Sequence, residues 1–164
     1  MTTTAPALDD APVPAPAPRI RLQQVPGVYE AMTALDKAAA DGLDPVVAEL
    51  VRTRASQLNG CAFCLDMHSR DARRRGVPEH KLHTLAAWRE TPFFTARERA
   101  ALALTEAVTR LGDHGVPDEV YDEAARRFEE PELARLLALA VAINAWNRIG
   151  VATRMSPTPR HDHA

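Results

Sequence analysis

The chain has 164 residues, enough for one domain that buries roughly two thirds of its unfolded surface, so it needs neither a metal nor a disulfide merely to fold. Its 20 Lys and Arg residues and 22 Asp and Glu residues leave a formal net charge of −2. This balance provides no global field to attract nucleic acid or an anionic membrane, so we expect neither as a partner.

The N-terminal part is rich in proline and alanine, and we expect residues 1–20 to form a disordered tail. It contains neither the basic n-region nor the apolar h-region of a secretory signal. The longest aliphatic run, Leu136 to Ile143, is shorter than the ~18 residues that a membrane-spanning helix needs. These patterns predict a soluble, cytoplasmic protein, in which thiols are normally reduced.

Residues 21–155 contain helix start and stop signals throughout, and no segment alternates apolar and polar residues over the length of a strand. The first helix is expected over residues 27–41. Asp44 and Pro45 then provide an N-cap and a first-turn proline for a second helix, which ends at Asn59 with Gly60 as its C-cap. A third helix is predicted over residues 61–75, and a fourth from Pro78 to just before Pro92.

Thr95 and Glu98 match a capping box and predict a fifth helix that ends near Gly112. Pro117 and Pro131 indicate two further helix starts. The last helix is apolar on nearly every side in its upper half, which indicates burial in the centre or at a subunit contact. The prediction is an all-α, single-domain bundle of about seven helices, followed by a flexible C-terminal tail over residues 156–164 that contains His161 and His163.

Both cysteines of the chain lie in the stretch "NGCAFCLDMH". Cys61, Cys64 and His68 are spaced by three and four residues, so on a helix they share one face. Cys61 lies in the first turn, where free N–H groups and the macrodipole lower the pKa of a thiol. The preceding helix turns back at Gly60, which allows Glu49 to face the same place and to pair with His68.

Three interpretations of this pattern compete. A structural disulfide would close a loop of only four residues and remove little entropy from the unfolded chain. A zinc site on Cys61, Cys64 and His68 would need a fourth ligand, for which His80 or His83 are the nearby candidates. A redox-active dithiol with a base alongside uses every residue of the pattern, and we favour it.

The segment "ELVRTRASQLNGCAFCLDMHSRDARRRG" resembles the core of alkylhydroperoxidase D-like (AhpD-like) proteins of the carboxymuconolactone decarboxylase superfamily. The shared pattern is a glutamate, eleven residues, Cys-x-x-Cys, three residues and a histidine, which Glu49, Cys61, Cys64 and His68 match. Through "AWRETPFFTARERAALALTEAVT" and "AINAWNR" the resemblance extends over roughly residues 22–155.

The resemblance implies an all-helical homo-oligomer, a trimer or hexamer, that reduces hydroperoxides and is regenerated by an external thiol reductant or redox protein, without a cofactor. It also implies that peroxide oxidises Cys64, that Cys61 is the proton donor and resolving thiol, and that Glu49 and His68 form a proton relay. The helix-dipole argument by itself favours Cys61 as the more acidic thiol.

One residue departs from the family pattern. Phe63 stands where the best-known alkylhydroperoxidase D proteins have a second relay histidine, and its ring is expected to line a pocket for an apolar substrate. This keeps open base chemistry on a carbon acid by Cys64 or His68, as well as a non-catalytic or zinc-binding oligomer. Asn144, Trp146, Asn147 and Arg148 are expected to serve structural pairing or an oligomer contact, with a place in the pocket as the alternative.

Overall fold

The computed structural model describes residues 13–158, so His161 and His163 lie outside the described residues. Seven α-helices and two short 3-10 segments make up the described part of the chain, which contains no β-strand. This confirms the expected all-α bundle. The helices are α1 (Pro26–Ala40), α2 (Pro45–Asn59), α3 (Ala62–Arg74), α4 (Glu79–Thr84), α5 (Ala96–Thr109), α6 (Asp118–Arg127) and α7 (Glu130–Thr153), with η1 (Leu22–Gln24) and η2 (Leu85–Glu90).

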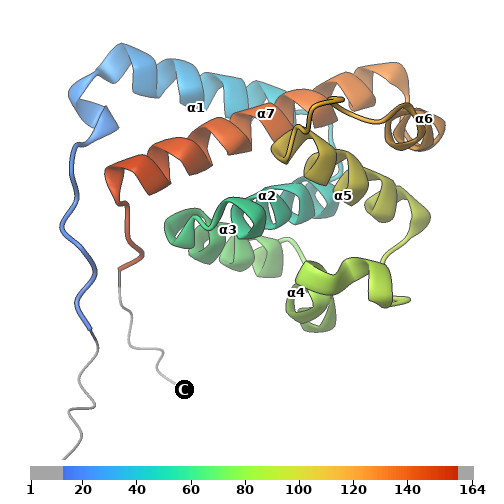
Figure 1. Ribbon diagram of the computed structural model, residues 1–164, viewed down its shortest axis with the longest axis horizontal. Coiled ribbons are helices and arrows are strands. Elements are labelled where there is room, and N and C mark those ends of the chain that lie inside the picture. Colours follow the sequence, from blue (N-terminus) through green and yellow to red (C-terminus); the bar gives the residue numbers. More distant parts are fainter. Residues whose placement is uncertain (1–12, 159–164) are drawn as a thin grey trace, which may run out of the picture.

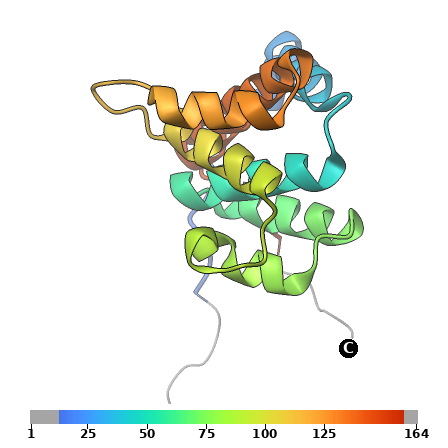
Figure 2. The same cartoon turned by 90° about the vertical axis from the view of Figure 1, so that its right-hand side faces the viewer.

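Helix α2 lies at the centre of the bundle and packs against α3, α5 and α7. Figure 1 shows α1 and α7 along one side of the molecule, α2 and α3 below them, and α4 at the opposite side from α1. Figure 2 shows the same layers from the end, with α5 between α6 and α4. The Cys-x-x-Cys segment therefore begins where α2 turns into α3, next to α7.

Local capping chemistry sets several of the helix bounds. Asp44 accepts hydrogen bonds from the N–H groups of Val46 and Val47 at the start of α2. Gly60 ends α2 in the left-handed conformation (φ 66°), which a glycine adopts without strain. Thr95 and Glu98 form the predicted capping box of α5.

The predicted fourth helix is in fact broken. Helix α4 ends at Thr84, and η2 follows with Ala87 in a non-helical conformation (φ −121°, ψ 33°). Trp88 is buried just after the break, and its indole N–H donates to Glu106 at 2.8 Å. Since buried Trp N–H groups require a partner, this contact with α5 favours a turn over a continued helix.

The apolar core has two parts. One lies between α1, α2, α5, α6 and α7 and is built on Val51, Leu104, Leu136 and Leu139. The other packs α4 and η2 onto α2 and α5 through Leu50, Leu85, Trp88 and Leu102. Helix α7 is long and apolar enough to cross a membrane (mean hydropathy 1.4), but nine of its residues are buried inside the bundle. Its sequence predicts burial in the centre or at a subunit contact, and the central burial is confirmed, while Val141 and Val151 remain exposed.

Candidate active site

The cysteine pair lies at the junction of α2 and α3. Cys61 is the N-cap of α3, and its Sγ accepts a hydrogen bond from the N–H of Cys64 at 3.4 Å. The Sγ atoms of Cys61 and Cys64 are 2.7 Å apart, and both cysteines are free thiols. Both side chains are buried.

The hydrogen bond between the two thiols shifts their pKa values in opposite directions. The pKa of Cys61 is lowered to about 7, first because its ionised sulfur accepts a hydrogen bond from the Cys64 thiol, which outweighs the raising effect of burial. The N–H groups of Cys64 and Phe63 and the amide of Asn147 lower it further. The same hydrogen bond raises the pKa of Cys64, and burial and the charge on Cys61 add to this. The first proton that the pair loses therefore comes from Cys61, with a pKa of about 7, and the resulting charge resides on the Cys61 sulfur.

Glu49 and His68 meet between α2 and α3. The Nδ1 atom of His68 is 3.2 Å from Oε2 of Glu49, and both side chains are buried. Burial raises the pKa of Glu49, but the hydrogen bond with His68 and the charge of Arg52 outweigh it, so the pKa lies below its usual value. Glu49 is thus a carboxylate at neutral pH, and it lies against the imidazole of His68.

Arg52 anchors this carboxylate to a third helix. It donates to Oε1 of Glu49 at 2.8 Å and to Oδ2 of Asp36 on α1 at 2.7 Å. A buried carboxylate needs such partners, because desolvation would otherwise favour its protonated form. The Cys-x-x-Cys pattern does not indicate Arg52 or Asp36, although Arg52 follows Glu49 by three residues, the spacing of an ion pair on one helix face.

A buried amide cluster supports the thiols from the side of α7. Asn59 donates to the side-chain oxygens of Asn144 and Asn147, each at 2.9 Å. Asn147 donates to Ser56 at 3.1 Å, and its amide also interacts with both thiols. Asn147 was expected to serve structural pairing, and Asn59 was not considered. The three-residue spacing of Asn144 and Asn147 on an apolar helix was the available signal.

Gly150 brings the backbone of α7 directly against the thiol pair. A Cβ atom at this position would lie 2.9 Å from Sγ of Cys61 and 3.7 Å from Sγ of Cys64. Only a glycine leaves room for the Cys61 sulfur in its present place, since real Cβ contacts are almost never closer than 3.0 Å. Nothing in the local sequence pattern distinguishes this glycine from one that is merely tolerated in a helix.

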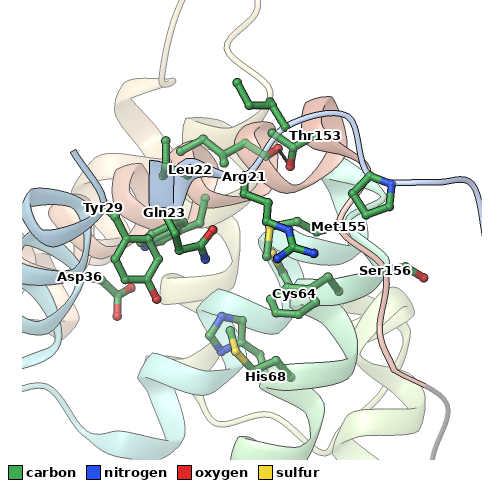
Figure 3. A pocket seen from close by; sticks show the side chains of 16 residues that line it. Arg21, Leu22, Gln23, Tyr29, Asp36, Cys64, His68, Thr153, Met155 and Ser156 are labelled. Carbon is green, nitrogen blue, oxygen red and sulfur yellow. Dashed lines mark hydrogen bonds between the residues drawn. The ribbon is translucent and has the colours of Figure 1, made fainter. Parts of the chain in front are cut away.

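A cavity of about 550 Å³ opens onto Cys64 and His68. Cys64 lines this cavity, whereas Cys61 does not. Figure 3 shows Cys64 and His68 on one side, with Arg21, Leu22 and Gln23 reaching over them from the opposite side. The apolar part of the lining includes Leu22, Phe63, Met67, Trp146, Ile149 and Met155. Phe63 thus lines a largely apolar pocket, as its position predicts.

The N-terminal arm, residues 18–23, forms one wall of this pocket. Arg19 fixes the arm to the end of α7: its backbone N–H donates to the carbonyl of Thr153 at 3.0 Å, and its guanidinium donates to the carbonyl of Ala152 at 3.2 Å. Pro18 and Ile20 belong to the segment that composition predicts to be a disordered tail, yet they line the cavity. Residues 1–12 of that predicted tail lie outside the described residues.

The zinc hypothesis is not supported by the positions of its ligands. Among residues 13–158, the group whose potential ligand atoms lie within 4.8 Å of one another is Glu49, His68 and Asp71, and it includes neither cysteine. His80 packs edge-on against Phe93, and His83 is exposed beside Glu79. Within this group Glu49 and His68 already pair with each other, and Glu49 also binds Arg52.

An all-helical bundle with a buried Cys-x-x-Cys at a helix start, and a Glu–His pair between that helix and the preceding one, defines a class of helical dithiol proteins. The sequence profile of the carboxymuconolactone decarboxylase family matches residues 26–107, half of the chain. The chain belongs to this family and is AhpD-like.

Relatives agree with this assignment. The chain is 43% identical over 104 residues to the uncharacterized protein YdfG of Bacillus subtilis, covering 63% of this chain and 71% of YdfG. It also matches a crystal structure from Agrobacterium tumefaciens, of a protein of unknown function proposed to be an antioxidant defence protein AhpD. That match has a TM-score of 0.82 and 35% identity, over 87% of this chain and 100% of the other.

The debrominase Bmp8 has a similar structure, solved as a cysteine-to-alanine variant with 2,3,4-tribromopyrrole. Its TM-score is 0.72 at 23% identity, over 81% of this chain and 72% of Bmp8. At this identity the likeness shows the fold alone. Debromination is thus named as the activity of one protein with this fold.

Proposed function

We propose that this protein is a thiol-dependent peroxidase that reduces organic hydroperoxides, with Cys64 as the attacking thiol and Cys61 as the resolving thiol. The observation that carries the proposal is the placement of the pair: Cys64 lines the pocket, and the sulfur of Cys61 lies 2.7 Å from that of Cys64 without lining it. A hydroperoxide in the pocket reaches Cys64 first. The family pattern implies that Cys64 is the attacking thiol. This agrees with the access of Cys64 to the pocket, whereas the lower pKa belongs to Cys61.

The lower pKa of Cys61 gives that thiol a role as base. The ionised Cys61 accepts the proton of Cys64 while the Cys64 sulfur attacks the terminal oxygen of the hydroperoxide and the O–O bond breaks. Cys64 becomes a sulfenic acid, and the departing alkoxide takes a proton from Cys61 and leaves as the alcohol. Cys61 is again a thiolate and lies beside its next target.

Closure of the disulfide completes the half-reaction. The Cys61 thiolate attacks the Cys64 sulfur, the S–O bond breaks, and hydroxide leaves as water after taking a proton from His68. Glu49 compensates the positive charge of the protonated imidazole before this transfer, and solvent in the pocket reprotonates the ring afterwards. A small dithiol or a redox protein supplies two electrons to restore both thiols.

The apolar pocket beside His68 favours a second candidate, base chemistry on a carbon acid. Phe63 stands where other family members have a second relay histidine, and it adds apolar surface to the pocket. Such a surface suits a carbon-acid substrate as well as a hydroperoxide. The two candidates differ in what happens to the thiols, because base chemistry leaves both of them reduced.

A thiol titration tests the proposal. Purified, reduced protein is treated with one equivalent of cumene hydroperoxide, and free thiols and cumyl alcohol are counted. We expect two thiols to be lost and one alcohol to form. Persistence of both thiols while hydroperoxide remains would overturn the proposal, and oxidation of an equivalent Cys64→Ser variant would overturn the assignment of the attacking thiol.

We further propose a homo-oligomer, a trimer or hexamer, in the cytoplasm. Apolar side chains on α1 and α7 support an assembly, since Val28, Leu35, Val141 and Val151 are 42–54% exposed. Light scattering after size exclusion measures the mass, and a monomer at micromolar concentration would contradict the assembly. The cytoplasm provides the reducing conditions that a recycled dithiol requires.

A further inference from the structure

The pocket above Cys64 is far larger than the terminal oxygen of a hydroperoxide requires. A water molecule occupies about 30 Å³ in the liquid, whereas this cavity measures about 550 Å³, within the range of sites for drug-sized ligands. Its walls are mainly apolar, with Trp146 in edge-on contact with Tyr29 at one side. Hydrogen peroxide would leave nearly all of this surface unused.

One cation reaches into this apolar space. Arg21 lines the cavity, and Figure 3 shows its guanidinium extended from the N-terminal arm towards Cys64. Among the described residues, no carboxylate or carbonyl accepts a hydrogen bond from this guanidinium. The carboxylate and the imidazole of the lining already have partners, since Asp36 pairs with Arg52 at 2.7 Å and His68 pairs with Glu49 at 3.2 Å. Arg21 is therefore available to a ligand.

The arm that carries Arg21 is held in place. The two hydrogen bonds of Arg19 to the last turn of α7 lie two residues before Arg21, and the single turn of η1 follows it directly. A fixed backbone lowers the entropic cost of presenting a long side chain to a ligand. The guanidinium fork also matches the two oxygens of a carboxylate.

We propose that the pocket binds an apolar organic hydroperoxide that carries a carboxylate, and that Arg21 binds the carboxylate while the apolar body occupies the space between Phe63 and Trp146. This inference names the substrate class of the proposed peroxidase and therefore rests on that function. Arg21 acts as a specificity residue and takes no part in the transfer of oxygen or protons.

Binding is tested without turnover by titrating the reduced protein with decanoate and with 1-decanol, which lacks the charge. Trp146 lines the pocket while the other tryptophan, Trp88, is buried in the α4 part of the core, so fluorescence quenching reports on the pocket. Arg21→Met should weaken decanoate binding by about tenfold and change decanol binding by less than about twofold. Arg21→Lys should retain part of the preference.

Arg110→Met is the matched control, because Arg110 is an exposed arginine at the end of α5 and does not line the cavity. It should leave both affinities unchanged. Equal binding of decanoate and decanol to the wild type, or an equal effect of the two methionine variants, would overturn the inference. Circular dichroism spectra of the variants confirm that each is folded.

A second measurement separates this inference from the proposed function. The wild type and Arg21→Met are compared on linoleic acid hydroperoxide and on its methyl ester, and we expect the variant to lose rate on the acid alone, through KM. If both hydroperoxides are reduced but the variant keeps the wild-type preference, the inference fails and the peroxidase stands. If neither hydroperoxide oxidises the thiols while the binding of decanoate still depends on Arg21, the proposed peroxidase function is wrong and the anion-binding role of Arg21 is retained.

Discussion

The sulfur of Cys61 lies 2.7 Å from that of Cys64, but the two thiols differ in acidity and in access. Cys61 has the lower pKa and is enclosed by Cys64, Asn147 and Gly150, whereas Cys64 has the higher pKa and lines the pocket. The charged sulfur and the accessible sulfur are thus different atoms. Transfer of one proton from the Cys64 thiol to the Cys61 thiolate is enough to place the negative charge on the accessible sulfur of Cys64.

Replacement of each cysteine should give a different product. Cys64→Ser should abolish hydroperoxide consumption, because no thiol then faces the pocket. Cys61→Ser should still form a sulfenic acid on Cys64 but no disulfide, which mass spectrometry after dimedone trapping detects. Loss of the Cys61 charge should also bring the pKa of Cys64 down towards its usual value. Trapping of sulfenic acid on Cys61 instead would reverse the two roles.

The rate of thiol oxidation should depend on the ionisation of Cys61. The pKa of this thiol is lowered to about 7, so it is protonated as the pH falls below that value and can no longer accept the Cys64 proton. The single-turnover rate should therefore fall with an inflection near pH 7, measured by stopped flow. An inflection at the usual thiol pKa of about 8.5 would show that the Cys61 charge plays no part.

Gly150→Ala should disturb the thiol pair. The new Cβ would lie 2.9 Å from the Cys61 sulfur, which must move, so we expect slower disulfide formation and a loss of stability of about 1–3 kcal/mol from overpacking. Gly27→Ala on α1 is the matched control, since nothing lies within 4 Å of its Cβ position. Urea unfolding and single-turnover kinetics measure both effects. Identical behaviour of the two variants would contradict the role of Gly150.

Glu49→Gln should slow disulfide formation while retaining the fold. The amide keeps the size of the side chain but cannot compensate a protonated His68, and loss of acid–base assistance costs roughly 10²-fold or more in rate. Glu98→Gln is the control, because Glu98 is equally buried and pairs with Lys81 at 2.6 Å on other helices. Both variants should lose stability by urea unfolding. If both or neither lose activity, the relay is wrong.

Asn147→Ala should raise the pKa of Cys61, because its amide lowers the pKa of that thiol. Asn144→Ala is the matched comparison. Asn144 is also buried and also binds Asn59, but its other partners are Thr109, Arg148 and the carbonyl of Ala140 rather than the thiols. Thiolate absorbance against pH measures the shift. An equal shift in the two variants would assign it to general loosening of α7.

Local patterns allowed much of the fold to be predicted. The caps at Asp44, Gly60 and Thr95 are encoded within a few residues of each helix end, and their hydrogen bonds appear as expected. The break at Ala87 was not predictable in this way, because it depends on a hydrogen bond from Trp88 to Glu106, 18 residues away. The facing of Glu49 and His68 followed from the sharp turn at Gly60.

Contacts between distant segments could not be predicted. Asn59 binds Asn147 across 88 residues, and Arg19 binds Ala152 across 133. Helical periodicity identifies which face of a helix is buried, but it does not reveal which helix covers that face. The same limitation applies to Gly150, whose role becomes visible only when α7 is packed against Cys61.

The attachment of Arg19 to the last turn of α7 means that the reacting residues and the wall opposite them come from different parts of the chain. The thiols, glutamate and histidine all come from α2 and α3, whereas the wall opposite them comes from the first and last described segments. If the protein has the proposed function, substitutions in residues 18–23 would change which molecules enter the pocket and would leave the two thiols, Glu49 and His68 in place. Substrate preference could then differ between related chains through their terminal segments, without a change in the reacting residues.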